Sequence, residues 1–313
     1  MALATWFKAL ADETRLRILS LTLSQELNVQ ELVEILSMGQ SRVSRHLRIL
    51  SDCGLLGSRR DGLWAFYRAP AGGPGREFLG AVAPLLAGDP LLARDREHAV
   101  ELVAAGRGRS RKFFDAVAPE WDHRKAELLG GTDLEKEVLA RLPACKVAAD
   151  LGCGTGTLLA GMLATAATVI GVDSSPRMLE VARRACVTSG KTFELRLGEL
   201  EHLPLREGEA DAAVLNLVLH HLRSPLEGLR EAYRVLRPGG TLVLADLTRH
   251  QEEELRGRFG DRWLGFEPSR SSGFAPGELD SWLAEAGFTI ENESGLPLAR
   301  GLTARIITAR RNA

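Results

Sequence analysis

The sequence predicts an α/β protein of two domains, a helical N-terminal domain that ends in a hairpin and a C-terminal domain built on a mostly parallel sheet. At 313 residues, the chain exceeds the usual size of one domain. The first seventy residues show helical apolar spacing followed by a short two-strand pattern. From residue 146 onward strands and helices alternate, which requires parallel strands covered on both faces.

The overall composition indicates a globular protein without strong net charge. Hydrophobic residues make up 45% and charged residues 26% of the chain, and the formal net charge is -1. These values exclude a disordered or strongly basic chain. The four cysteines form no CxxC pair, and the longest weakly polar run, residues 158–172, is too short to span a membrane. We therefore expect a cytoplasmic protein with reduced cysteines and no membrane partner.

Four helices are expected in the first domain, and the fourth, residues 40–51, has two distinct faces. Val43, Leu47 and Leu50 recur at helical spacing and should be buried. The opposite face carries short hydroxyls and arginines, which suit contacts with base edges and phosphates in a major groove. The predicted DNA-contacting residues of this helix are Gln40, Ser41, Arg42, Ser44, Arg45, His46 and Arg48.

A basic hairpin is expected to follow this helix. Asp61-Gly62 is typical of a type I′ turn, so residues 55–68 should form two strands. Residues 41–68 hold six arginines and only two acidic residues, an excess that suits a DNA-facing element. Arg59 and Arg60 lie beside the tip and are predicted to contact the DNA backbone or minor groove. The alternative is a small helical bundle with a solvated basic face.

Residues 1–70 resemble the ArsR family of winged helix-turn-helix regulators. The matching segments are ALADETRLRIL from Ala9, VSRHLRIL from Val43 and Gly54-Leu-Leu. The resemblance implies a double-stranded DNA operator as partner. The third-helix segment lacks the cysteines of the best-known metal sensors in that family. Asp95, His98 and Glu101 could offer metal ligands from one helix, but a solvated helix face is expected instead, and no metal site is predicted.

Residues 71–107 are expected to connect the two domains. Glycine- and proline-rich segments at 70–75 and 106–109 predict joints on either side of apolar helices. In the resembled family such helices hold a dimer together, which implies a homodimer with two recognition helices about 34 Å apart. The expected domains are a winged helix at 1–70, connector and dimerisation helices at 71–107, and a third region at 108–313.

A glycine-rich loop follows the first strand of the second domain. Asp150 ends that strand, and Gly152, Gly154 and Gly156 follow at every second position. Glycines let the backbone approach a ligand closely within a tight strand-to-helix turn. Asp173 ends the next strand, 21 residues after Gly152, where an acid can accept both hydroxyls of a ribose. The loop therefore predicts a cofactor that contains a nucleoside.

Two cofactors compete for this loop, a nicotinamide dinucleotide and S-adenosylmethionine (SAM). The GxGxG spacing, unlike GxGxxG, arranges few backbone donors for a pyrophosphate, which SAM lacks. The amino group of SAM needs a carboxylate partner such as Asp150. Glu199, after the third strand, could accept from an adenine amino group. SAM is therefore the expected cofactor, and S-adenosylhomocysteine the expected product.

The ordered motifs of residues 113–312 resemble class I SAM-dependent methyltransferases that modify small molecules. The resemblance implies a Rossmann-like domain with a seven-stranded, mostly parallel sheet, whose last strands lie near residues 289–294 and 304–309. It also implies that Asp150 and the three glycines hold the methionine portion while Asp173 holds the ribose. The remaining implied contacts are Ser174 and Met178 flanking adenine, Glu199 and Leu200 at its edge, and Asn216 near the sulfonium.

The side chains around the methyl acceptor are less clearly marked. Residues 113–122 resemble the lid helix of these enzymes, with Phe114 and Trp121 either closing over the cofactor or simply packing on the sheet. His221 is the candidate general base, and a histidine that only packs or hydrogen-bonds is the alternative. Residues 250–273 are expected to cover the acceptor pocket. An arsenite acceptor is disfavoured because the cysteines lie on the cofactor side.

Three functions agree with these patterns. The first is a SAM-dependent methyltransferase fused to an ArsR-type transcriptional regulator and acting on a small molecule. The second is a non-catalytic regulator in which SAM or S-adenosylhomocysteine changes DNA affinity. The third is a methyltransferase whose winged helix serves only dimerisation.

Overall fold

The computed structural model describes residues 2–61, 64–186, 193–267 and 277–312. The chain divides into two compact units, Met1–Arg109 and Ser110–Ala313, and each is described by itself. Helix α6 (Pro90–Val117) contributes residues to both units. The predicted glycine-rich joint at residues 106–109 lies within this helix.

The first unit is a helical domain with a small antiparallel sheet. The sheet has the order β1-β3-β2. The elements that precede α6 are α1 (Ala2–Leu10), α2 (Glu13–Ser24), β1 (Leu27–Asn28), α3 (Val29–Leu36), α4 (Gln40–Asp52), β2 (Gly57–Asp61), β3 (Trp64–Arg68) and α5 (Pro74–Ala87). This order of four helices and a hairpin is the predicted winged helix. The predicted type I′ turn falls on residues 62–63, outside the described residues.

Local sequence signals explain why the helices of this unit begin where they do. The Asn28 side chain accepts a hydrogen bond from the Glu31 backbone N–H, and the Glu31 carboxylate accepts one from the Asn28 N–H. This predicted capping box starts α3. Val43, Leu47 and Leu50 of α4 are fully buried, as their spacing predicts. The apolar face of α4 therefore fixes the opposite, basic face toward solvent.

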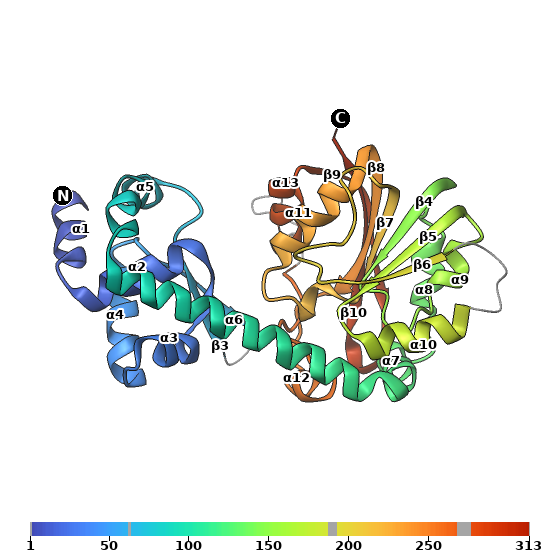
Figure 1. Ribbon diagram of the computed structural model, residues 1–313, viewed down its shortest axis with the longest axis horizontal. Helices are drawn as coiled ribbons and strands as arrows, with labels where there is room; N and C mark the ends of the chain where they lie inside the picture. The colour runs from blue at the N-terminus through green and yellow to red at the C-terminus, as the bar shows by residue number, and fades with distance from the viewer. Residues whose placement is uncertain (1, 62–63, 187–192, 268–276, 313) are drawn as a thin grey trace. The chain divides into compact units, whose positions relative to one another are not determined.

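The second unit is built on a seven-stranded sheet of order β6-β5-β4-β7-β8-β10-β9 (Figure 1). Among the described strands of this sheet, only β10 runs antiparallel to its neighbours. The strands are β4 (Cys145–Leu151), β5 (Ala166–Asp173), β6 (Phe193–Leu197), β7 (Ala210–Asn216), β8 (Leu236–Leu247), β9 (Phe288–Pro297) and β10 (Thr303–Arg311). The predicted fold class, including both final strands, is confirmed.

Helices cover both faces of this sheet (Figure 1). They are α7 (Trp121–Leu129), α8 (Leu134–Leu139), α9 (Leu159–Met162), α10 (Pro176–Cys186), α11 (Pro225–Val235), α12 (Glu254–Arg258) and α13 (Glu278–Ala286), with short 3₁₀ turns η1 (Ala118–Glu120), η3 (Leu219–His221) and η4 (Ala299–Gly301). Alternate strand residues enter different cores: Ala148 packs with α8, α9 and α10, whereas Ala149 packs with α11 and α13. This alternation follows from the period of two in a strand.

The region expected to cover an acceptor pocket is packed more deeply than the sequence suggests. Trp263 and Phe266 are 3% and 1% exposed and pack against Trp282 of α13. Residues 268–273 of that region lie outside the described residues. Within the described ranges, no helix combines the length and apolar character that a membrane span needs.

Candidate functional site

The glycine-rich loop between β4 and α9 depends on left-handed backbone. Gly152, Gly154 and Gly156 have φ values of 85°, 52° and 82°, a region that disfavours side chains. A Cβ at Gly152 would lie 2.4 Å from Val218 Cγ2, and one at Gly156 would lie 2.9 Å from Ala182 Cβ. The loop is therefore pressed against the turn after β7 on one side and α10 on the other.

Two acids stand at the carboxyl ends of β4 and β5, beside this loop. Asp150 is 2% exposed, and burial raises its pKa to about 7 even though Lys125 opposes the shift. Asp173 accepts hydrogen bonds from the backbone N–H of Gly154 at 2.9 Å and from that of Ser175 at 2.8 Å. Burial nevertheless raises the Asp173 pKa above its ordinary value. Asp150 is thus a buried acid at the edge of the sheet, and Asp173 is a partly exposed one.

The start of α10 is fixed by a short hydrogen-bond chain. Ser175 Oγ donates to Asp115 Oδ1 at 2.6 Å, and the Met178 N–H donates to Ser175 Oγ at 3.1 Å. Met178 is 1% exposed and packs with Val117 and Ala118. Met178 and Ser174 therefore lie at one end of the loop region, where adenine contacts were predicted. Asp115 was not recognised in the sequence, because its partner lies 60 residues away.

Leu200 and Asn216 approach the same loop from β6 and β7. Leu200 is 8% exposed, and its Cδ1 lies 3.5 Å from the Cβ position of Gly152. Asn216 ends β7, and its buried Oδ1 has no hydrogen-bond partner in the described part of the chain. An unpaired buried amide oxygen is rare in a finished interior and indicates a ligand-facing position. Glu199 is half-buried at the start of the same segment.

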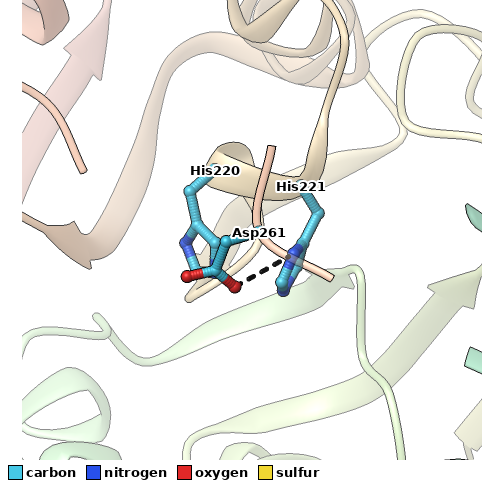
Figure 2. Close-up of side chains that lie close together, drawn as sticks. All are labelled: His220, His221 and Asp261. Atoms are coloured by element: carbon cyan, nitrogen blue, oxygen red, sulfur yellow. Dashed lines mark ion pairs between the residues drawn. The ribbon is translucent and has the colours of Figure 1, made fainter. Parts of the chain in front are cut away.

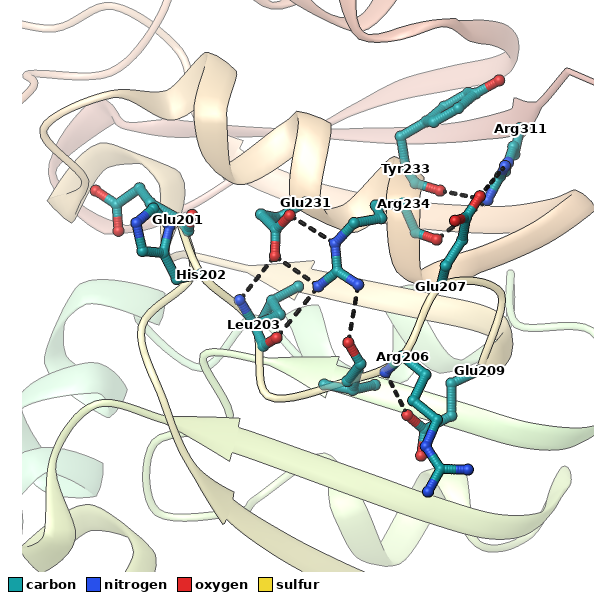
Figure 3. A network of polar contacts seen from close by, with 11 residues as sticks. Glu201, His202, Leu203, Arg206, Glu207, Glu209, Glu231, Tyr233, Arg234 and Arg311 are labelled. Atoms are coloured by element: carbon teal, nitrogen blue, oxygen red, sulfur yellow. Dashed lines mark hydrogen bonds and ion pairs between the residues drawn. The ribbon is translucent and has the colours of Figure 1, made fainter.

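A polar network holds the segment from Glu201 to Glu209, which precedes β7 (Figure 3). The Glu231 carboxylate accepts from the Leu203 N–H at 2.8 Å and from Arg234 at 2.7 Å. Arg234 also donates to the carbonyl oxygens of Leu203 and Leu205 at 3.2 and 2.9 Å. Both side chains come from α11, so this helix anchors residues 203–205, which follow shortly after Glu199 and Leu200.

A second group of titratable side chains lies after β7 and β8. His220 Nδ1 lies 2.6 Å from Asp246 Oδ1, and His220 Nε2 lies 3.5 Å from Asp261 Oδ1. Burial alone would lower the pKa of His220, but Asp246 and Asp261 outweigh it and raise that pKa to about 9. Burial raises the pKa of Asp261 to about 6 against the attraction of His220. The sequence marked neither acid.

His221, the predicted general base, lies beside two aromatic side chains. Its ring centroid is 5.0 Å from that of Phe114 and 6.2 Å from that of Trp121. Burial, followed by repulsion from His220, lowers the pKa of His221 well below 6.5, so the ring is neutral at pH 7. Trp121 Nε1 also lies 3.7 Å from the Cβ position of Gly154. Trp121 therefore links the glycine loop to His221.

Helix α4 of the first unit presents the predicted DNA-reading residues in two groups. Those with exposed side chains are Gln40, Ser41, Arg42, Arg45 and Arg48. Ser44 is half-buried, and His46 Nδ1 lies 3.5 Å from Asp12 Oδ1. Burial lowers the pKa of His46. His46 is therefore an intramolecular contact of α2 as well as a member of the polar face.

Of the two hairpin arginines, Arg59 makes contacts within the first unit. Arg59 pairs with Glu26 at 2.9 Å, and its guanidinium stacks 4.5 Å above the centre of the Phe66 ring. Contact with DNA would have to compete with this pair. The Arg60 side chain lies outside the described part of the structure, although its backbone pairs with Ala65.

The fold and these two sites define a class I SAM-dependent methyltransferase joined to a winged-helix DNA-binding domain. Residues 149–244 match the methyltransferase domain family, and residues 12–58 match the bacterial regulatory protein family, arsR type. The ubiquinone biosynthesis O-methyltransferase of Xanthomonas axonopodis pv. citri (strain 306) is 30% identical over 194 residues, which are 60% of this chain and 80% of that protein. The chain belongs to the SAM-dependent methyltransferase family and carries an arsR-family regulatory domain.

Two further comparisons show how much of the chain other proteins match. An uncharacterized 37.1 kDa protein in transposon TN4556 of Streptomyces fradiae is 48% identical over 103 residues, so the match spans 32% of this chain and only 29% of that relative. A chain from the complex between the Haloferax volcanii Trm112 methyltransferase activator and a methyltransferase superposes with a TM-score of 0.53 at 18% identity, covering 64% of this chain and 98% of its own. The second likeness is one of fold.

Proposed function

We propose that this protein transfers the methyl group of SAM to a hydroxyl of a small molecule and that it also binds operator DNA through α4. The observation that carries the methyltransferase proposal is the joint placement of the glycine loop, Asp150, Asp173 and the unpaired Asn216 oxygen at one edge of the sheet. Open α/β sheets bind their ligands at the carboxyl ends of the strands. The relative from Xanthomonas, an O-methyltransferase by name, supports an oxygen acceptor.

In this proposal each group at the sheet edge has a separate task. Asp150 accepts from the amino group of SAM, and the backbone of Gly152, Gly154 and Gly156 lies against the methionine portion. Asp173 accepts from the ribose hydroxyls. The adenine ring lies between Ser174 and Met178 with Glu199 and Leu200 at its edge, and Asn216 lies near the sulfonium.

Methyl transfer then requires mainly positioning, because the sulfonium is already activated. A lone pair of the acceptor oxygen forms the bond to the methyl carbon while the S–CH₃ bond breaks. The bonding electrons remain on sulfur, which becomes the neutral thioether of S-adenosylhomocysteine. The hydroxyl proton goes to His221, whose lowered pKa keeps the ring neutral near pH 7. Phe114 and Trp121 line this side and exclude water.

DNA binding and dimerisation complete the proposal for the first unit. The exposed arginines of α4, namely Arg42, Arg45 and Arg48, suit contacts with guanine edges and phosphates. A single short helix binds DNA weakly, so a homodimer is expected to present two such helices to a palindromic operator. Large apolar side chains that the first unit leaves exposed supply a surface for the partner copy: Leu3, Phe7, Leu85, Leu91 and Val100. A protein that uses operator DNA and SAM in this way acts in the cytoplasm.

A regulatory role for SAM has its own support in α6. The helix contributes Asp95 to the first unit, where the carboxylate binds Arg17 at 2.6 and 2.8 Å. It also contributes Asp115 and Val117 to the cofactor side of the second unit. In this proposal α6 contributes residues to both the unit that binds DNA and the unit that binds the cofactor. A coupling free energy of about 1–3 kcal/mol would change operator affinity about 5–150-fold.

The deciding experiment separates these roles with one protein preparation. SAM should raise the melting temperature, and mass spectrometry of a metabolite extract incubated with labelled SAM should reveal one labelled methyl ether. Operator titrations with SAM, S-adenosylhomocysteine and no cofactor measure the coupling. A SAM-induced shift without any methylated product would support the sensor instead of the enzyme, and operator binding that is absent in every state would leave α4 without a DNA role.

A further inference from the structure

The ligand atoms of His220, His221 and Asp261 lie farther apart than in a hydrogen-bonded network, and a small closing movement would bring them to the spacing of a coordination shell (Figure 2). Asp261 Oδ1 lies 3.5 Å from His220 Nε2 and 3.8 Å from His221 Nδ1. The three ligand atoms all lie within 4.8 Å of one another. Hydrogen bonds would require about 2.7–3.2 Å. In a tetrahedral zinc site, bonds of about 2.0–2.2 Å separate neighbouring ligand atoms by about 3.3–3.6 Å.

The carboxylate of Asp261 is otherwise costly where it lies. Its side chain is 2% exposed, and Oδ1 has no hydrogen-bond partner in the described ranges of the chain. A buried carboxylate oxygen without a hydrogen bond loses its hydration, and the attraction of His220 at 3.5 Å compensates for that loss only in part. A cation placed between Asp261 and the two rings would supply the missing interaction.

Asp246 contacts the nitrogen of His220 that does not face Asp261. Its Oδ1 lies 2.6 Å from His220 Nδ1, so that nitrogen carries the proton and donates. Nε2 is thereby left as the nitrogen that faces Asp261. A carboxylate that binds the far nitrogen of a metal-binding histidine fixes both its tautomer and its orientation. Asp246 is itself held by the Leu219 N–H at 2.9 Å.

We propose that His220 Nε2, His221 Nδ1 and Asp261 Oδ1 bind a divalent transition-metal ion, with Zn²⁺ as the expected ion. Two imidazoles and one carboxylate suit zinc and its first-row neighbours, whereas magnesium and calcium prefer oxygen ligands alone. Three protein ligands leave a fourth position for another molecule, as in catalytic zinc sites. The Gly260 carbonyl, 3.4 Å from His221 Nδ1, is the contact that the ion would replace.

The open position gives the ion a role in the reaction, and this step rests on the proposed function. An acceptor hydroxyl would become more acidic on binding the ion and would lose its proton to water as the acceptor enters the site. Its oxygen then forms the bond to the methyl carbon as the S–CH₃ bond breaks. The bonds made and broken are the same as without metal, but the ion replaces His221 as the group that activates the oxygen.

The experiment uses the full chain, freed of metal with a chelator and titrated with Co²⁺ as a spectroscopic probe for the zinc site. We expect one Co²⁺ per chain, visible absorption bands typical of a tetrahedral ion, and displacement by Zn²⁺. Asp261→Asn and His221→Ala should abolish the bands. Asp246→Asn should weaken binding about 10–100-fold, as loss of such a carboxylate does elsewhere. His123→Ala is the matched control, because it removes a histidine of α7 whose side chain is 82% exposed.

Each outcome decides between two descriptions of the cluster. If the wild type binds no Co²⁺ or Zn²⁺, or if Asp261→Asn and His221→Ala leave the bands unchanged, the proposal is wrong. The histidines and Asp261 then form only an ion-paired structural cluster. The same samples are tested for a SAM-induced rise in melting temperature, which reports folding of the variants. A SAM response without metal binding overturns only the metal site, whereas metal binding without a SAM response overturns the proposed function and leaves the site.

Discussion

His220 and Asp246 form an ion pair of 2.6 Å with almost no exposure to solvent, 3% for the histidine side chain and 1% for the aspartate. The pair joins the turn after β7 to the end of β8. The backbone N–H groups of Leu219 and Leu247 also donate to Asp246, at 2.9 and 2.7 Å. Asp246 therefore holds the backbone of the turn after β7 and of the end of β8 in place, in addition to pairing with His220.

Removing the charge of Asp246 should destabilise the second unit. Asp246→Asn leaves a buried histidine with a weaker partner, and breaking a buried pair typically costs about 3–5 kcal/mol. Urea unfolding measures the change. The control is Glu227→Gln, which breaks a pair with Arg230 that is about half exposed and should cost less than about 1 kcal/mol. A loss below about 1 kcal/mol in Asp246→Asn would mean that the pair does not stabilise the fold.

SAM affinity should depend on the protonation of Asp150. Its pKa is raised to about 7, so the carboxyl is mostly protonated below that pH and must release its proton to accept from the SAM ammonium group. We expect affinity measured by calorimetry to fall as pH decreases below about 7. Asp150→Asn should bind weakly with a flat profile, and Asp52→Asn, an exposed acid of α4, should retain the wild-type profile. If the SAM affinity of Asp150→Asn still falls steeply as pH decreases, a group other than Asp150 takes up the proton.

The same raised pKa predicts a gain in stability when Asp150 is neutralised. A carboxyl with a folded-state pKa of about 7 disfavours the folded state increasingly as pH rises from its ordinary value through 7. Without SAM, Asp150→Asn should therefore melt at a higher temperature than the wild type at pH 8. The difference should shrink toward pH 5. An unchanged melting temperature at pH 8 would show that the ionised Asp150 carboxylate is compensated by another group in the folded protein.

The glycine loop offers a matched pair of substitutions. Gly152 and Gly239 both have positive φ, 85° and 72°, but a Cβ meets Val218 at 2.4 Å in the first case and nothing within 4 Å in the second. Gly152→Ala should abolish the SAM-induced thermal shift, because the loop must move away from Val218. Gly239→Ala carries only the backbone strain, about 1 kcal/mol, and should keep the shift. Equal SAM affinity in both variants would contradict the assigned loop.

Operator recognition should depend on Arg45 in a sequence-specific manner. The side chain is exposed on α4, and loss of an arginine contact to a base edge costs about 1–3 kcal/mol, or 5–150-fold in affinity. Arg45→Ala should weaken operator binding by that factor and relax the preference for the operator over random DNA. Arg94→Ala removes an equal charge from the exposed surface of α6 and serves as the control. Unchanged specificity in Arg45→Ala would place another face of α4 in the groove.

The proposed dimer should be sensitive to charge on the apolar surface of the first unit. Leu85 is 79% and Val100 65% exposed. If the partner copy covers them, Leu85→Glu combined with Val100→Glu should convert dimer to monomer in analytical ultracentrifugation. Leu197→Glu, at a residue 55% exposed in the second unit, should leave the mass unchanged. A dimer that survives the double substitution would locate the interface elsewhere.

Local patterns determined the elements and the cofactor loop of this protein. The helical spacing of Val43, Leu47 and Leu50 predicted which face of α4 is buried, because periodicity of side chains is a property of neighbouring residues. The glycines and the acids at strand ends located the loop and the sheet edge for the same reason. These signals are local, and together they determine the fold class.

Only the tertiary structure decided which distant side chains meet. Asp246 reaches His220 because β7 and β8 are parallel neighbours that end at one edge, and Asp261 joins them because residues after α12 fold back, with Arg262 N–H donating to the His220 carbonyl oxygen. Arg59 likewise meets Glu26 across 33 residues. Such encounters depend on strand order and loop path, which no local spacing encodes, so the sequence offered His221 as a lone base, whereas the fold places it beside His220 and Asp261.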